Sequence, residues 1–154
     1  MSSGPDECAR QVLETIPLVM RVIRAQMRSH RVAGLSVPQF RALIFLNRHE
    51  GGSLSDVAGH VGLMLPSMSR MIDGLVARDL VMRQVAAADR RRVELTLTSR
   101  GRAAMRSAYE STQAHLSKRL AALPEPDRTI ILKAMQALAS IFGSRREATN
   151  AAGG

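Results

Sequence analysis

Three consecutive arginines, Arg90, Arg91 and Arg92, stand between two short segments that have the composition of β-strands. Residues 93–97 alternate apolar and polar side chains, which predicts a strand with one buried face. Residues 81–85 are the expected partner strand, although Arg83 interrupts their alternation. The arginines then occupy the tip of a hairpin, where they can bind phosphate or enter a narrow minor groove. A solvated turn is the alternative interpretation of so short a charge run.

A predicted helix comes directly before this hairpin and has Pro66 in its first turn. Its apolar stripe consists of Met68, Ile72, Leu75 and Val76. Ser67, Ser69 and Arg70 fall outside that stripe, which leaves a small polar face free. A helix of this kind fits the major groove of duplex DNA, so the helix and the hairpin together indicate nucleic-acid binding.

Two shorter helices are predicted upstream of this one. The first covers residues 38–48, with a mostly buried face made by Phe40, Leu43, Ile44 and Leu46 or Asn47. The second opens with a capping box, Ser53 to Asp56, and closes at Gly62. A short turn containing that glycine leads to the helix at Pro66, which predicts a helix-turn-helix.

Longer helices are expected at both ends of the chain. The first covers residues 7–31, a second runs from about 99 to 123, and residues 124–127 break it and cap a third. The first helix carries a stripe of Val12, Ile16, Val19, Met20, Ile23 and Met27. Because a 25-residue helix exceeds what one small core can cover, a second copy of the chain is its expected partner. Residues 143–154 are small and polar and are expected to be disordered.

Composition supports a polyanionic partner. The 154 residues contain 22 Lys and Arg against 13 Asp and Glu, a net charge of +9, and 20 of the cations are Arg. Residues 64–102 hold eight Arg and four acids. Cys8 is the single cysteine, so one chain forms no disulfide or cysteine zinc site. With no apolar run of membrane-spanning length and no signal peptide, a soluble cytoplasmic protein is expected.

Catalytic chemistry finds no support in the residue pattern. No nucleophile with its base, phosphate-binding glycine loop or pair of carboxylates near apolar positions is visible. The four histidines are scattered without an H-x-x-x-H pair. No catalytic residue, metal site or cofactor is therefore predicted.

Three short sequence motifs, which occur in the same order, resemble those of the multiple-antibiotic-resistance regulator (MarR) family of winged-helix transcription factors. Residues 89–98 fit the wing pattern D-x-R-x-x-x-L-x-L-T, and Gly101 follows them. Residues 35–40 resemble the L-[ST]-x-x-Q-[FY] opening of a helix, and residues 69–75 resemble the [ST]-R-L-[VI]-D-x-L core of the recognition helix. The similarity extends from about Ile16 to Phe142.

The resemblance implies a mainly α-helical fold with a small β-hairpin wing. The winged helix-turn-helix lobe would cover residues 37–98, and residues 7–31 and 99–142 would supply the dimerisation helices. The expected function is that of a homodimeric regulator, a repressor by the family default. Each subunit would place one helix in the major groove and one wing in the minor groove of a pseudo-palindromic operator in double-stranded DNA.

The DNA-facing positions implied by the resemblance are Leu65, Pro66, Ser67, Ser69, Arg70, Asp89, Arg90, Arg91 and Arg92. Asp89 is expected to pair with Arg91 and so fix the wing tip for Arg90. Met64 and Leu65 depart from the family, which usually has Ser or Thr and then a polar residue. The helix therefore lacks a side-chain N-cap, a loss of about 1 kcal/mol. Leu65 either meets a thymine methyl group or packs within the protein.

Many members of the family respond to a small aromatic or anionic effector. Arg28, His30, Arg31 and Arg41 lie near the expected junction of lobe and dimer helices and are the candidate ligand residues. Redox sensing through Cys8 is disfavoured because activating tyrosines are missing at the family's positions. The alternative function is that of a basic nucleic-acid-binding or protein-interaction module without a ligand response.

Overall fold

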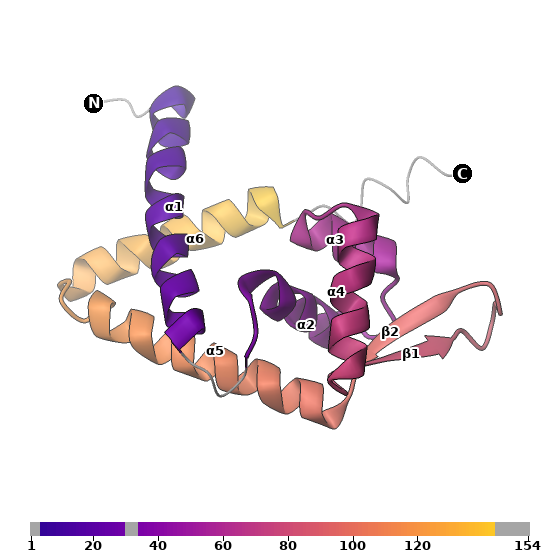
Figure 1. The fold of residues 1–154 in the computed structure, drawn as a ribbon. Helices are drawn as coiled ribbons and strands as arrows, with labels where there is room; N and C mark the ends of the chain where they lie inside the picture. Colours follow the sequence, from indigo (N-terminus) through magenta and orange to yellow (C-terminus); the bar gives the residue numbers. More distant parts are fainter. Residues whose placement is uncertain (1–3, 30–33, 144–154) are drawn as a thin grey trace. The chain divides into compact units, whose positions relative to one another are not determined.

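The computed structural model describes residues 4–29 and 34–143, in which six helices and one two-stranded hairpin are found (Figure 1). The elements are α1 (Pro5–Ser29), α2 (Val37–Arg48), α3 (Leu54–Val61), α4 (Leu65–Ala77), β1 (Val81–Val85), β2 (Val93–Leu97), α5 (Ser99–Leu120) and α6 (Glu125–Phe142). This order matches the predicted one. The predicted tail, apart from Gly143, lies outside the described residues.

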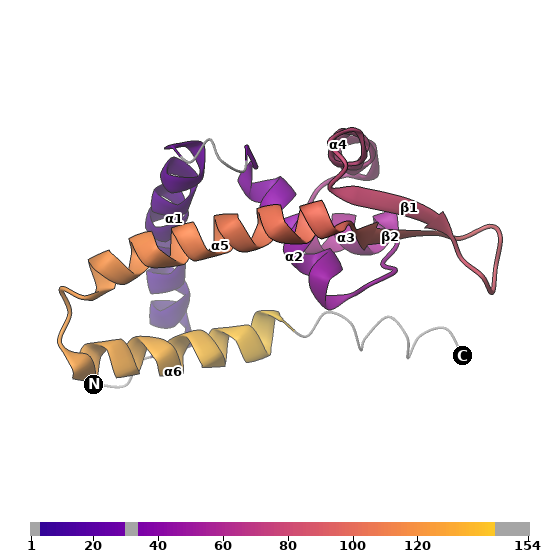
Figure 2. The same ribbon diagram turned by 90° about the horizontal axis from the view of Figure 1, so that it is seen from below.

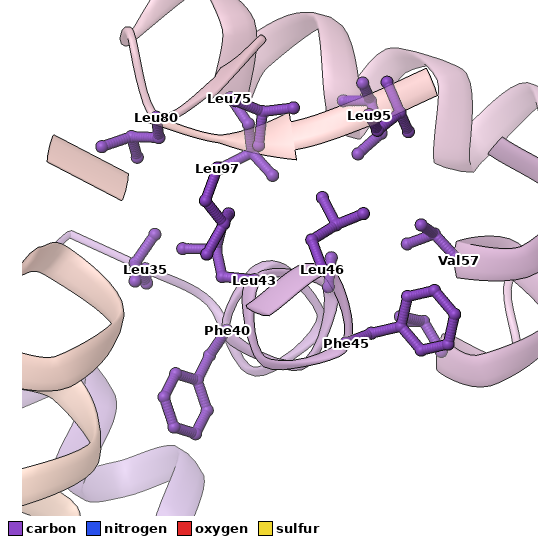
Figure 3. Packing of buried hydrophobic residues seen from close by; sticks show 14 of the residues in the cluster. Leu35, Phe40, Leu43, Phe45, Leu46, Val57, Leu75, Leu80, Leu95 and Leu97 are labelled. Atoms are coloured by element: carbon purple, nitrogen blue, oxygen red, sulfur yellow. The ribbon is translucent and has the colours of Figure 1, made fainter. Parts of the chain in front are cut away.

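The core of residues 1–115 forms around α2. Leu43 and Leu46 of this helix point toward Leu95 and Leu97 of β2, whereas Phe45 points toward α3 (Figure 3). The leucines of this cluster are almost completely buried, and each such burial is worth about 1.5 to 3 kcal/mol. The predicted face of α2 is confirmed at Phe40, Leu43 and Leu46. The sequence pattern missed the burial of Ala42 and Phe45, and Asn47 is exposed.

Local capping signals determine where the short helices begin and end. At the start of α2, Ser36 and Gln39 form a reciprocal capping box, and Ser53 and Asp56 form the predicted one at the start of α3. Gly62 ends α3 at a φ of 81°, a left-handed conformation that glycine adopts without a steric penalty. Residues 62–64 then turn the chain into α4, which confirms the predicted helix-turn-helix.

The hairpin pairs β1 with β2 in the antiparallel register Val81 to Leu97 and Val85 to Val93. The outer edge of β2 is also paired, because Gly51 N–H donates to Leu95 O at 3.2 Å and Leu95 N–H donates to Gly52 O at 2.9 Å. The hairpin extends away from the helices of the lobe (Figure 2). We call residues 81–97 the wing.

The wing leads directly into α5 through a tight junction. Thr98 caps this helix, since its Oγ1 accepts a hydrogen bond from Gly101 N–H at 2.9 Å and donates one to Asp79 O at 2.6 Å. Gly101 approaches the strand start so closely that an added Cβ would lie 1.9 Å from Leu80 O. Only glycine fits this position without moving the backbone.

In α1 the apolar stripe is only partly buried, and Val12, Met20 and Ile23 are half-buried. Met27 is buried at the end near the core, whereas Leu13 is 74% exposed and Ile16 and Val19 are also exposed. The helix begins two residues before the predicted start and is described to Ser29. Its contact with α5 includes a hydrogen bond from Gln26 Nε2 to Ser111 Oγ at 3.3 Å.

Of the described residues, 116–143 form a second compact unit, which consists of the C-terminal end of α5 and of α6. The helix α5 ends at Leu120, three residues short of the end predicted at about residue 123. The N-cap of α6 is Pro124, which lies within the predicted breaking and capping segment of residues 124–127. Pro124 offers no capping side chain, and Glu125 and Asp127 instead lie in the first turn, where the helix dipole favours carboxylates.

Candidate nucleic-acid interface

The helix α4 separates a buried stripe from a polar exposed face. Met68, Ile72 and Leu75 are completely buried, as the spacing predicted. Pro66, Ser67 and Arg70 are exposed and Ser69 is half-buried. Four of the predicted DNA-facing residues therefore lie on the surface of one helix, with hydroxyl and guanidinium groups able to donate hydrogen bonds.

The first turn of α4 is apolar and uncapped. Met64 occupies the N-cap with an extended backbone, φ −68° and ψ 149°, and its side chain makes no capping hydrogen bond. Met64 and Leu65 are 78% and 50% exposed. The predicted lack of a side-chain cap is confirmed, and packing within the chain covers only half of Leu65.

The wing tip is a short turn organised by Asp89. Its Oδ1 accepts a hydrogen bond from Arg91 N–H at 3.0 Å and lies 3.6 Å from Arg91 Nε, which is the expected ion pair. The turn is closed by Arg92 N–H donating to Asp89 O at 3.0 Å and by Ala86 N–H donating to Arg92 O at 2.9 Å. Arg90, Arg91 and Arg92 are all exposed, so the tip presents three cations to solvent.

An ion pair that the sequence analysis missed joins the wing to α4. Arg83 Nη2 of β1 donates to Asp73 Oδ1 of α4. The signal was present in the sequence, because Arg83 interrupts the alternation of β1 and Asp73 lies on the polar face of the predicted helix. Their contact depends on the packing of the two elements, which the pattern does not specify.

The candidate ligand residues are not gathered into one described site. Arg28 is exposed at the end of α1, and His30 and Arg31 lie outside the described residues. Arg41 binds the C-terminal end of α3, donating to His60 O at 2.8 Å and to Val61 O at 3.1 Å. A cation at that position also interacts favourably with the helix dipole, so Arg41 has a structural use.

Two histidines flank a buried phenylalanine beside this contact. The Phe45 ring centroid lies 4.6 Å from that of His49 and 4.9 Å from that of His60. Desolvation lowers the pKa of His60, and the charges of Arg41, His49 and Arg48 lower it further. His60 is therefore held in its neutral form where α3 packs against α2.

Metal binding, thiol chemistry and membrane insertion are three further possibilities for the chain. In 4–29 and 34–143, no three or more His, Cys, Asp or Glu side chains are placed to hold a metal ion. Cys8 is exposed near the start of α1. Across that part of the chain, every helix falls short of the length and apolarity required to cross a membrane.

Sequence comparison finds a known family over the lobe. Residues 35–93 match the model of the MarR family. The chain is 28% identical over 104 residues to the uncharacterized HTH-type transcriptional regulator YfiV of Bacillus subtilis, a match covering 68% of this chain and 65% of YfiV. It is also 28% identical over 107 residues to the HTH-type transcriptional repressor Rv2887 of Mycobacterium tuberculosis, covering 70% of this chain and 77% of Rv2887.

Solved structures share the fold over most of the chain. The transcriptional repressor CouR, bound to a 23-mer DNA duplex, superposes with a TM-score of 0.69 at 24% identity, covering 91% of this chain and 98% of CouR. Rv2887 in complex with p-aminosalicylic acid superposes with a TM-score of 0.67 at 24% identity, covering 82% of this chain and 96% of that protein. The likeness supports the order of helices and hairpin described above.

Proposed function

The chain belongs to the MarR family of winged-helix transcriptional regulators, and on that premise we propose how it engages duplex DNA. The helix α4 enters the major groove, and the wing places its arginines in the adjacent minor groove. The observation that carries this proposal is the ion pair from Arg83 to Asp73, which ties the arginine-tipped wing to the helix with the exposed polar face. CouR, of the same fold, is described as bound to a DNA duplex.

Each side chain at the interface has a proposed role. Ser67 and Ser69 donate hydrogen bonds to base edges or phosphate, and Arg70 binds guanine or phosphate. Asp89 orients Arg91, which leaves Arg90 to enter the minor groove and Arg92 to bind the backbone. Pro66 lies in the first turn of the helix and brings that turn close to the DNA. The excess of arginine in residues 64–102 supports strong, salt-dependent attraction to the duplex.

We further propose that two copies bind together. The lobe of residues 37–98 contacts the DNA, and the helices of residues 7–31 and 99–142 form the dimer. Large apolar side chains support this arrangement, since Leu13 and Leu18 of α1 are exposed and Ile130, Leu132 and Phe142 of α6 are exposed. A two-fold dimer reads a pseudo-palindromic operator with half-sites about one helical turn apart.

Repression and release by a small effector complete the proposal. Rv2887 is described as a repressor and, in its solved structure, as a complex with p-aminosalicylic acid. We propose a small aromatic or anionic effector for this chain, with Arg28, His30 and Arg31 as the cations that meet it. Arg41 is the fourth proposed cation. Because its guanidinium also binds the C-terminal end of α3, a movement of α2 would be transmitted through Arg41 to the helix-turn-helix.

A mobility-shift assay on the DNA flanking the protein's own gene tests the proposal. We expect a specific shift with two chains bound per duplex. An unlabelled palindromic competitor should remove this shift, whereas random duplex and single strands should not remove it. Binding to all duplexes with equal affinity, or to none, would contradict the proposal and favour a non-specific nucleic-acid or protein-interaction module.

The wing is tested in the same assay. Replacing both Arg90 and Arg91 with Ala is expected to weaken binding on every sequence and to flatten its salt dependence, because fewer counterions are released. Arg106→Ala, which removes an exposed cation of α5, is the matched control and should leave the slope unchanged. A slope unaffected by the double substitution would argue against any role of the wing in DNA binding.

A further inference from the structure

The DNA-facing surface of α4 begins with two exposed apolar side chains. Met64 is 78% exposed and Leu65 is 50% exposed, and both precede Ser67 and Arg70 on the same helix. The sequence left open whether Leu65 packs inside the protein. Because half of its surface remains accessible in the folded chain, a large apolar contact area stays available at this point of the helix.

The surroundings of Leu65 indicate what covers it. Arg70 follows on the exposed surface of the same helix, and the three wing arginines belong to the element that Arg83 holds against α4. Residues 64–102, which begin with Met64 and Leu65, hold eight Arg against four acids, and a segment of that net positive charge is complementary to a polyanion. In a recognition helix, the N-terminal residues are those that contact base edges.

Only one base edge offers an apolar group in the major groove. Thymine carries a C5-methyl group there, whereas adenine, guanine and cytosine present hydrogen-bond donors and acceptors. Leu65 has no donor or acceptor to offer those bases, and covering a cytosine amino group with leucine leaves that donor without a partner. Contact with a methyl group, in contrast, removes apolar surface from water on both sides.

We propose that Leu65 is a specificity-determining residue that reads thymine through its C5-methyl group, with Met64 extending the apolar surface. This inference rests on the proposed function. It assigns the chain an operator in which each half-site has a thymine at the base pair that Leu65 contacts. Recognition at that base pair comes from apolar contact rather than from a hydrogen bond.

Deoxyuridine provides the direct test, because it pairs as thymine does but lacks the methyl group. Binding sites are first selected from a random duplex library with the full chain. Each thymine of the selected site is then replaced singly by deoxyuridine, and binding is measured for the native protein and for Leu65→Ser. One methyl group is comparable to one buried methylene, so the native protein should lose about fourfold in affinity at one thymine of each half-site.

The inference predicts a coupled result. Leu65→Ser should bind thymine and deoxyuridine at that position equally, and Leu65→Met, which keeps an apolar side chain, should retain the preference. Replacing the base with cytosine should weaken binding by the native protein, and 5-methylcytosine should recover part of the loss. Since Leu65 is half exposed, its substitution should leave thermal unfolding nearly unchanged, which circular dichroism checks.

Failure of the inference differs from failure of the proposed function. Suppose that a specific duplex is selected, but that the native protein and Leu65→Ser respond alike to deoxyuridine at every thymine. This result would overturn the thymine assignment and leave the proposed regulatory function standing. The same holds if Leu65→Ser loses equal affinity on every duplex. Failure to enrich any duplex over the random library would overturn the proposed function itself.

Discussion

Arg83 in β1 donates to the carboxylate of Asp73 in α4, so the wing and this helix are joined by an ion pair outside the core. Both side chains are substantially exposed, and exposed pairs contribute only about 0.2 to 1 kcal/mol to stability. The pair matters more for geometry. It fixes the relative position of two elements that the proposed function places in neighbouring grooves of one duplex.

Replacing Arg83 with Gln should weaken DNA binding several-fold while lowering the free energy of unfolding by less than about 1 kcal/mol. Asp73→Asn should have the same effect, and the double variant should add little, as expected for two partners of one interaction. Titrations at several salt concentrations give the check. A positioning role leaves the salt slope unchanged, whereas a drop of about one unit would assign Arg83 to phosphate instead.

Met64→Ser should stabilise the chain by about 1 kcal/mol, because a serine at the N-cap of α4 can accept a hydrogen bond from an unpaired N–H of the first turn. Urea denaturation measures the gain. Met64→Ala removes the same exposed side chain without supplying an acceptor, and it should give no comparable gain. Equal stabilisation by the two variants would show that capping is not the cause.

Gly101→Ala should destabilise the chain by about 3 kcal/mol, at the upper end of overpacking penalties, because the new Cβ would collide with Leu80 O. Gly59 in α3 is the matched control. An added Cβ there meets nothing within 4 Å, so Gly59→Ala should stabilise its helix by up to about 1 kcal/mol. Thermal denaturation of both variants tests the close approach, and equal effects at the two glycines would contradict it.

Acid should weaken the lobe through His60. Folding lowers the pKa of this histidine, so below its ordinary value of about 6.5 the unfolded chain binds more protons than the folded chain. The stabilisation is complete above that value and is lost as pH falls through the lower folded pKa. Denaturation between pH 8 and 5 should show this loss, shallow because His60 keeps solvent contact. His60→Gln should reduce the pH dependence, and an unchanged profile would exclude His60 as its source.

Helix order, caps and the wing were predictable because local residues determine them. The start of α3 is determined by the capping box of Ser53 and Asp56, and its end by Gly62, all within ten residues of the chain. The hairpin is specified by the alternation of apolar and polar residues in a short strand next to an arginine-rich turn. The Arg83 to Asp73 pair, the contact of Arg41 with α3 and the burial of Phe45 depend on how separate elements pack. Sequence periodicity carries no information on those distances. Leu65 is an intermediate case, because the sequence left open whether its side chain packs within the protein, and the structure leaves half of its surface exposed.

The backbone hydrogen bonds that join Leu95 to Gly51 and Gly52 also bear on how the wing avoids unwanted association. A hairpin with two open edges is a template for adding strands from other chains, the first step toward aggregation. Here the lobe itself occupies the edge of β2 next to the core. The edge of β1 remains, and Arg83 at its centre places a charge where an incoming strand would pair. Besides its ion pair with Asp73, Arg83 thus disfavours the addition of a strand from another chain at the edge that the lobe leaves open.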